Sequence, residues 1–219
     1  MIDSGPLILL AALLAVEGTS VGQFMISRPL VAGFLAGFLV GDAAQGLLIG
    51  GLLELYYLPA VPIGGGRCPE PGPATVVAVG AAGLTAGPGS VAFGVFFGLA
   101  LGLLGGWTQE TARRLMTRLV PSPDQPNLVR RLSQVQWWGV AAAGIRGAAL
   151  AAFGLWVASG LVPLFAPQWP LSAGSTILLL ILAGCVSLGS VLAMLGGVRR
   201  RGSWLLAGAV AGIALGVLI

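Results

Sequence analysis

Apolar residues fill most of the 219-residue chain in long stretches separated by short polar gaps. In the first third, three such stretches cover about residues 6–24, 30–40 and 47–59. A helix needs about 20 apolar residues to cross a bilayer, so the second and third stretches are too short to span alone. Residues 30–60 are therefore expected to form either one long kinked helix or two half-helices that meet at Gly41 and Asp42.

The remaining pattern adds one irregular segment and several full-length spans. Residues 59–73 contain too many prolines and glycines for a helix, and a short apolar run follows at 74–87. Longer apolar stretches occupy about residues 91–107, 138–165, 174–197 and 203–219, and the 138–165 stretch exceeds what one span requires, which leaves a break within it open. The pattern predicts an all-α, polytopic membrane protein, with full-length spans plus broken or re-entrant half-helices in the N-terminal half, forming one domain over residues 1–219.

Composition agrees with a membrane protein and orients the chain. Only 8% of the residues are charged, against about 25% in soluble domains. The net charge of +4 comes entirely from arginines, which in a membrane protein mark cytoplasmic loops more than nucleic-acid partners. Residues 113–131 hold five arginines and one acid, so we expect them in the cytoplasm. The N-terminus lacks the basic region and cleavage site of a signal peptide, and the first helix is expected to be retained.

Glycines recur at every fourth position in three places. Small residues at this spacing lie on one face of a helix and allow close helix packing in lipid. We expect these faces to serve packing rather than a binding function. The three sets are Gly33, Gly37 and Gly41; Gly94, Gly98, Gly102 and Gly106; and Gly208, Gly212 and Gly216.

Charged residues inside the apolar stretches are the candidates for function. Glu54 has apolar neighbours on all sides, where a carboxylate costs several kcal/mol unless it is paired or hydrated. It either forms a structural ion pair with Arg28 or Arg67, or accepts hydrogen bonds from a polyol, which we favour. Asp42 follows a glycine and precedes a helical run, so a helix N-cap and a substrate or ion role are both open.

The irregular segment and the end of the first stretch supply further candidates. Arg67 and Glu70 lie in the Pro/Gly-rich segment, which is either a solvated surface loop or, as we favour, a re-entrant loop near Glu54. Gln23 precedes Arg28 and is expected to offer neutral hydrogen bonds. Glu17 is a weaker candidate by the same argument.

Catalytic and metal-binding motifs are missing from the sequence. It has no histidine, and its two cysteines, Cys68 and Cys185, are too far apart for a metal cluster or a disulfide framework. No phosphate-binding loop, nucleophile elbow or dinucleotide fingerprint occurs in its proper context. We therefore expect no catalytic residues in this chain and no cofactor, and an intramembrane enzyme is the weakest hypothesis.

The segment "SRPLVAGFLAGFLVGDAAQGLLIGGLLEL", followed by "PIGGGRCPEP", resembles the N-terminal half of the IIC component of the mannose/fructose/sorbose family of phosphotransferase system (PTS) sugar transporters. The resemblance covers roughly residues 20–75 and rests on hydropathy and glycine content beyond residue 90. It implies a IID membrane subunit as partner, with cytoplasmic IIA and IIB components that phosphorylate the sugar. The chain itself would then be one part of a sugar phosphotransferase complex.

The resemblance also implies roles for particular residues. The family's acid in the "LEL" helix falls on Glu54, and the acid or amide after the Gly-rich loop falls on Glu70. The Arg-Pro pair falls on Arg28 and Pro29, the turn aspartate on Asp42, and Gln23 lies in the polar patch before Arg-Pro. The sequence departs from mannose-type members at residues 25–27 and at residue 62, and it is short for the family, which leaves the sugar undetermined.

Two functions of different classes follow from these observations. The first is a sugar-permease subunit that binds a hexose or amino sugar and moves it across the bacterial inner membrane with IID, in a complex that oligomerises further. The second is a diverged, non-transporting membrane scaffold or regulatory subunit that kept the IIC fold. Neighbouring genes for IIA, IIB and IID would favour the first.

The orientation of residues 113–131 is directly testable. A cysteine introduced at Ser122, an uncharged position among the arginines, should be blocked by a membrane-impermeant thiol reagent only in opened cells, because arginine-rich loops resist translocation. Labelling in intact cells would contradict the cytoplasmic assignment.

Overall fold

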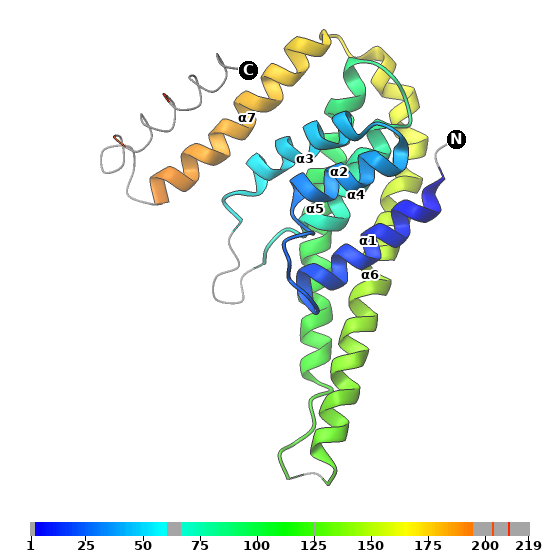
Figure 1. Cartoon of the computed structure of the whole chain (residues 1–219), viewed down its shortest axis with the longest axis vertical. Helices are drawn as coiled ribbons and strands as arrows, with labels where there is room; N and C mark the ends of the chain where they lie inside the picture. The colour runs from blue at the N-terminus through cyan, green and yellow to red at the C-terminus, as the bar shows by residue number, and fades with distance from the viewer. Residues whose placement is uncertain (1–2, 61–66, 125, 195–202, 204–209, 211–219) are drawn as a thin grey trace.

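The computed structural model describes residues 3–60, 67–124, 126–194, 203 and 210, and in these residues the regular structure is helical. Figure 1 shows the helices packed side by side around α4 and α5, with α7 along one flank. The elements are α1 (Ser4–Thr19), α2 (Pro29–Val40), α3 (Ala43–Tyr57), α4 (Pro71–Ala82), α5 (Pro88–Thr117), α6 (Leu128–Phe165), the 3-10 turn η1 (Ala166–Gln168) and α7 (Ala173–Met194).

Helix length divides the fold into two classes. Three helices in the described residues are long and apolar enough to cross a membrane: Pro88–Thr117, Leu128–Gln168 and Ala173–Ala193. Helices α1 to α4 have 12 to 16 residues, which corresponds to about 18–24 Å, less than the roughly 30 Å of a hydrocarbon core. The predicted class, an all-α polytopic membrane protein with short helices in its N-terminal half, is confirmed.

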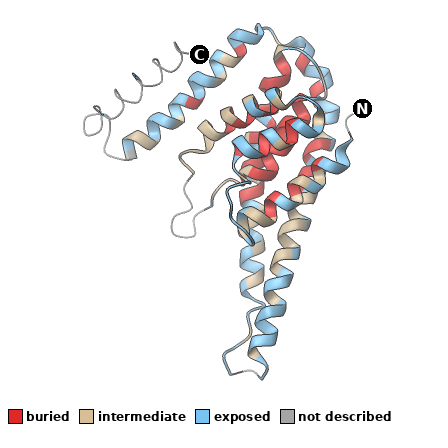
Figure 2. Cartoon of the chain, viewed as in Figure 1, coloured by how far each residue is buried: buried red, intermediate tan, exposed pale blue. Residues whose placement is uncertain are grey.

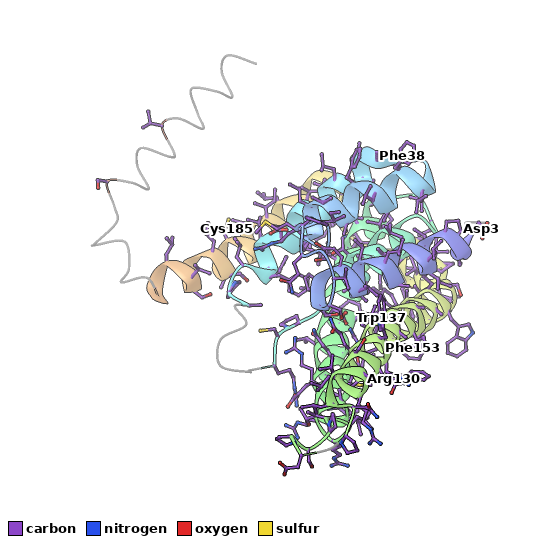
Figure 3. The ribbon with its side chains drawn as sticks, turned by 60° about the horizontal axis from the view of Figure 1, so that its bottom comes forward. Asp3, Phe38, Arg130, Trp137, Phe153 and Cys185 are labelled. Carbon is purple, nitrogen blue, oxygen red and sulfur yellow. The ribbon has the colours of Figure 1, made fainter. Side chains whose placement is uncertain are left out.

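Large apolar side chains cover much of the outer surface. Phe38 of α2 is 72% exposed, and Trp137 and Phe153 of α6 are 70% and 50% exposed; Figure 3 labels all three. A soluble monomer rarely exposes apolar patches of this extent. The exposed apolar surface therefore agrees with helices that face lipid or a neighbouring membrane subunit.

Helix α4 lies at the centre of the molecule. All of its residues from Gly72 to Ala82 are buried, and it contacts α1, α2, α3, α5 and α6. Figure 2 shows these buried residues in the middle of the short helices. A helix of 12 residues is too short to reach both edges of a membrane, so at least one of its ends lies at membrane depth, where free backbone groups are tolerated only inside protein or beside a watery cavity. The short helices supply that protein cover.

Helices α2 and α3 form a tight antiparallel hairpin. Gly41 ends α2 with a φ of 85°, a left-handed conformation that suits glycine, and Asp42 then caps α3. A Cβ atom on Gly33 would lie 2.8 Å from the Cα of Gly50, so the two backbones touch directly. Of the two expectations for residues 30–60, the pair of half-helices is confirmed and the single kinked helix is not.

The glycine face of α5 also packs closely. Added Cβ atoms on Gly94 and Gly98 would lie 3.0 Å from Ala82 and Ala78 of α4, and one on Gly98 would lie 2.7 Å from Leu53 of α3. The prediction of a packing role is confirmed for this face. Gly41 differs, because its position has no neighbour within 4 Å and serves the turn. The set at 208, 212 and 216 lies outside the described residues.

Helices α5 and α6 extend beyond their predicted ends. The apolar stretches predicted spans over about residues 91–107 and 138–165, yet α5 continues to Thr117 and α6 already begins at Leu128. Arginine is a good helix former, so a charged sequence does not by itself end a helix. Helix α6 is also unbroken over its 38 residues, about 57 Å. In Figure 1 the two helices project together below the rest of the fold.

Two other boundaries differ from the expectation. The first apolar stretch stops being helical at Thr19, because Gly22, Gln23 and Met25 have positive φ angles of 96°, 51° and 67°. Helix α4 begins at Pro71, inside the expected loop, since proline is well tolerated in the first turn of a helix. Most of the Gly-rich part of that loop (residues 61–66) and most of the final apolar run (203–219) lie outside the described residues.

The backbone contact in the hairpin predicts a strong response to a single methyl group. Gly33→Ala should lower the free energy of unfolding by about 1–3 kcal/mol, because the new Cβ would overlap the backbone of α3. Thermal unfolding in detergent measures the loss. Gly51→Ala is the matched control, since its Cβ would find only ordinary contact with Leu30 at 3.7 Å. Equal stability of the two variants would argue against backbone contact.

Candidate functional site

Glu54 and Arg28 meet where α3 ends and α2 begins. The antiparallel hairpin brings the last turn of α3 beside the first turn of α2, and Arg28 Nη1 donates to Glu54 Oε1 at 3.2 Å. The amide of Leu30 donates to Glu54 Oε2 at 3.4 Å. Arg28 is the N-cap residue of α2 and makes no side-chain cap bond, so the carboxylate of Glu54 takes this place at the positive end of the helix dipole.

This carboxylate keeps capacity for a ligand. The side chain of Glu54 is 27% exposed and that of Arg28 is 54% exposed, so both reach the molecular surface. An ionised carboxylate offers about four acceptor positions, and among the described residues two donors approach it. Arg28 is the partner of Glu54, which decides between the two arginines expected from the sequence.

Glu17 holds the segment that leads into α2. Its Oε2 accepts from the amide of Ser27 at 2.9 Å, and its Oε1 accepts from the amide of Ile26 at 3.3 Å. The same segment contains Gln23, which is exposed and has a left-handed backbone conformation. Glu17 and Glu54 thus satisfy backbone amides on both sides of Arg28.

Asp42 lies at the other end of the hairpin. Its Oδ1 accepts from the amide of Gln45 at 2.8 Å, so the capping interpretation accounts for the carboxylate. The 12 residues of α2 separate it from Arg28 by about 18 Å along the helix axis. Asp42 and the Arg28–Glu54 pair therefore do not share one binding site of hexose size.

Glu70 forms a buried, two-pronged ion pair with Arg146 of α6. Arg146 Nη2 donates to Glu70 Oε1 at 2.6 Å, and its Nη1 donates to Glu70 Oε2. The two side chains are only 6% and 12% exposed. The amide of Glu70 also donates to the carbonyl of Gly102 on α5 at 2.9 Å. Glu70 therefore occupies a fixed position between α5 and α6 and not a solvated surface loop.

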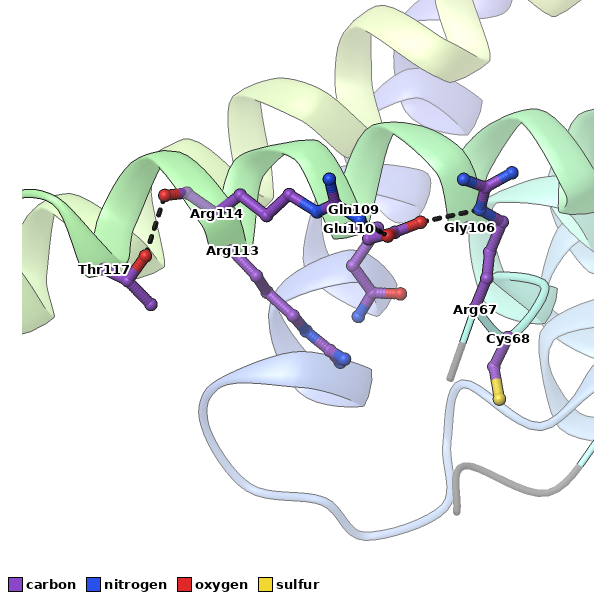
Figure 4. Close-up of a pocket in the computed structure, with 8 residues that line it drawn as sticks. All are labelled: Arg67, Cys68, Gly106, Gln109, Glu110, Arg113, Arg114 and Thr117. Carbon is purple, nitrogen blue, oxygen red and sulfur yellow. Dashed lines mark hydrogen bonds and ion pairs between the residues drawn. The ribbon is translucent and has the colours of Figure 1, made fainter. Parts of the chain in front are cut away.

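Arg67 belongs to a third charged cluster, near the C-terminal end of α5. Arg67 Nε donates to Glu110 Oε2 at 2.6 Å, and Arg114 Nη2 donates to Glu110 Oε1 at 2.5 Å. Figure 4 shows the two arginines reaching Glu110 from opposite sides. A cavity of about 270 Å³ opens beside this cluster and is also lined by Arg113.

The six residues selected from the sequence thus fall into separate groups. Arg28 and Glu54 are in direct contact, whereas Glu70 and Arg67 are bound by partners that the sequence analysis did not select, Arg146 and Glu110. Arg146 carried a usable signal, because a charge within the apolar stretch 138–165 requires a buried partner. Glu110 carried no such signal in the sequence, since it lies at the polar end of its helix.

The chemistry available at the hairpin base is hydrogen bonding and charge. Among the described residues there is no group of three or more histidine, cysteine, aspartate and glutamate side chains that could hold a metal ion. A carboxylate beside a guanidinium offers acceptors and donors together, which is the combination that recognises hydroxyl groups. The arrangement suits binding of a neutral, polyhydroxylated ligand.

The buried pair predicts a large loss of stability when one partner is removed. Arg146→Gln should lower the free energy of unfolding by about 3–5 kcal/mol, because it leaves the Glu70 carboxylate buried and unpaired. The double variant Glu70→Gln with Arg146→Gln should recover most of the loss, since neither charge remains. Arg114→Gln, at an exposed pair, should change little. Thermal unfolding in detergent compares the variants, and a fully stable Arg146→Gln would contradict the prediction.

Sequence comparisons agree with this architecture. A family model described as the sorbose-specific IIC component of the PTS matches residues 4–196. The sorbose-specific EIIC component of Klebsiella pneumoniae is 26% identical over 130 residues, which cover 59% of this chain and 48% of the relative. The mannose-specific EIIC component of Escherichia coli K12 is 26% identical over 131 residues, 60% of this chain and 48% of the relative. The chain thus spans about half the length of the curated relatives it matches.

Solved structures share the fold. One described only as a membrane protein superimposes with a TM-score of 0.70 over 98% of this chain and 92% of that chain, at 19% identity. The cryo-EM structure of the mannose transporter ManYZ with microcin E492 gives 0.54, over 100% of this chain and 93% of that chain, at 21% identity. With residues 4–196 matched by the family model, the chain belongs to the family of sorbose-type IIC components of the phosphotransferase system.

Proposed function

We propose that the chain is the sugar-permease subunit of a phosphoenolpyruvate-dependent PTS, and that it binds and translocates a hexose or amino sugar. The family match over residues 4–196 is the observation that carries the proposal. The short helices α2, α3 and α4 support it, because interrupted helices at membrane depth are typical of transporter binding sites. The named substrates of its relatives, sorbose and mannose, are both hexoses.

Glu54 and Arg28 are the proposed sugar contacts. The carboxylate accepts hydroxyl donors, and the guanidinium donates to hydroxyl oxygens on the same side of the ligand. Glu54 lies on a helix whose packing fixes it, because the next residues bond to neighbouring helices: Tyr56 Oη donates to the carbonyl of Leu180, and Tyr57 Oη to that of Gly98. Glu70 is proposed to hold the helices around the site, and not to bind sugar directly.

The complex proposed around this subunit follows the family resemblance. A IID subunit would cover part of the exposed apolar surface, and cytoplasmic IIA and IIB components would carry out phosphorylation. The location is the bacterial inner membrane, crossed several times by this chain, in a higher oligomer of IIC–IID units. The similarity of fold to ManYZ, a mannose transporter, supports a two-subunit arrangement.

The alternative is a diverged subunit that kept the fold without transport. The charge pairing favours it, because Glu70 and Arg67 are already bound by protein partners, which leaves Glu54 as the one acid of the Arg28–Glu54, Glu70–Arg146 and Arg67–Glu110 pairs that keeps acceptor positions for a sugar. Binding of a panel of hexoses and amino sugars to the purified complex with IID separates the two functions. Saturable binding of one sugar supports the permease, and the absence of binding across the panel supports the scaffold.

The proposed contact is tested by a change that keeps the shape of Glu54 and removes its charge. Glu54→Gln should weaken sugar binding by about 1–2 kcal/mol, or roughly 5–30-fold, on the scale of one charged hydrogen bond. Folding and IID association should survive, because the amide oxygen can still accept from Arg28 or Leu30. Calorimetric titration and thermal unfolding on the same purified variant give both quantities.

Asp42→Asn is the matched control, an acid-to-amide change at the far end of the same hairpin. Asparagine caps helices about as well as aspartate, so stability and sugar affinity should both stay close to wild type. If Glu54→Gln lowers stability but leaves the sugar affinity intact, Glu54 is a structural residue and the proposed site is wrong.

A further inference from the structure

The C-terminal end of α5 carries a positively charged cavity that the proposed sugar site does not use. It is about 270 Å³ in volume and is lined by Arg67, Glu110, Arg113, Arg114, Gln109 and Thr117 among others. All but Arg67 lie on the last turns of α5, and Arg67 approaches from the segment before α4 (Figure 4). The cavity is thus assembled from two segments that are 43 positions apart in the sequence.

The cavity holds more positive charge than its own acid neutralises. Three guanidinium groups face one carboxylate, which leaves a formal excess of two positive charges among the lining residues. Glu110 is shared by Arg67 and Arg114. Arg113 forms no ion pair with a described residue, and it also lines a second hollow of about 280 Å³. Its guanidinium is therefore available to a ligand.

The arginines in the cavity also have free donors. Arg67 uses its Nε for Glu110, so both of its terminal nitrogens remain, and Arg114 uses its Nη2, so its Nη1 remains. Guanidinium groups bind phosphate oxygens through paired, charge-assisted hydrogen bonds. The set of donors matches a tetrahedral oxyanion better than a neutral polyol, which needs acceptors as well.

The cavity lies close to the edge of the membrane. From Pro88 to Gly106, which also lines it, α5 rises about 27 Å, close to the roughly 30 Å of a hydrocarbon core. By the arginine distribution this is the cytoplasmic edge. A ligand can thus arrive from the cytoplasm or as the headgroup of a lipid in the inner leaflet.

We propose that this cavity binds a phosphomonoester. Such a group carries about −1.5 to −2 charges at pH 7, which matches the excess of two positive charges. The two possible sources are a soluble sugar phosphate and a lipid with a phosphomonoester headgroup. The inference goes beyond the proposed permease activity, because it concerns an anion and a separate set of residues.

The test measures binding of glucose 6-phosphate to the full chain in nanodiscs of phosphatidylcholine, by calorimetric titration. Wild type should bind saturably. Arg113→Gln should weaken binding about tenfold, as expected for loss of one charged hydrogen bond. Glu110→Gln should have the opposite sign and strengthen binding, because Glu110 is the only acid among the described residues that line the cavity, and its removal releases two arginines.

Arg118→Gln is the control, since Arg118 ends α5 one turn further on and does not line the cavity. It should bind like wild type. Equal weakening by Arg113→Gln and Arg118→Gln would show general attraction to a basic surface and overturn the proposal. Weaker binding by Glu110→Gln would also overturn it.

A second arm distinguishes the sources. Phosphatidic acid is added to the nanodiscs, and native mass spectrometry counts the lipids that the protein retains. If phosphatidic acid is retained by wild type and by Arg118→Gln but not by Arg113→Gln, the ligand is a lipid headgroup. If the protein binds glucose 6-phosphate but retains no phosphatidic acid, the ligand is soluble. If wild type binds neither probe, the proposal is wrong, whereas hexose uptake without anion binding leaves the permease function standing.

Discussion

The ion pair between Glu70 and Arg146 is the constraint that ties the short helices to the long ones, because neither buried charge is tolerated without the other. Glu70 directly precedes α4, and its carboxylate is held by α6 while its amide is held by the carbonyl of Gly102 on α5. One residue thus fixes the start of α4, which is buried from Gly72 to Ala82, against α5 and α6. Because a charge in a low-dielectric interior is costly when it is unpaired, any movement of α4 relative to α6 that separates Glu70 from Arg146 is strongly disfavoured.

Much of the fold follows from the sequence because the membrane restricts the choices. The lengths of the apolar stretches distinguished the spanning helices from α2 and α3. The turn at Gly41 and Asp42 could be predicted because glycine ends helices and aspartate caps them. The ends of α5 and α6 could not be predicted, since hydropathy reports where a helix leaves lipid and not where it stops being helical. The early end of α1 depends on positive φ angles at Gln23 and Met25, residue types for which this conformation is uncommon.

The site was predicted in part. The cost of a lone carboxylate identified Glu54 and required an arginine, but pattern alone could not choose between Arg28 and Arg67, because the choice depends on the antiparallel packing of α2 and α3. The same reasoning, applied to arginines as well as acids, would have found Arg146. With most of the selected charges already paired in the protein, the ligand chemistry of this family member rests on the few groups that keep free donors or acceptors.

The backbone contact between α2 and α3 also has a consequence for entropy. Where two helices meet through glycine, no rotamer is frozen when the contact forms, so its ordering costs only backbone freedom. The contact has a single geometry as well, since there are no side chains to repack around a shifted partner. The hairpin of α2 and α3 is therefore expected to move as one rigid body, so that any displacement of Glu54 also displaces Arg28.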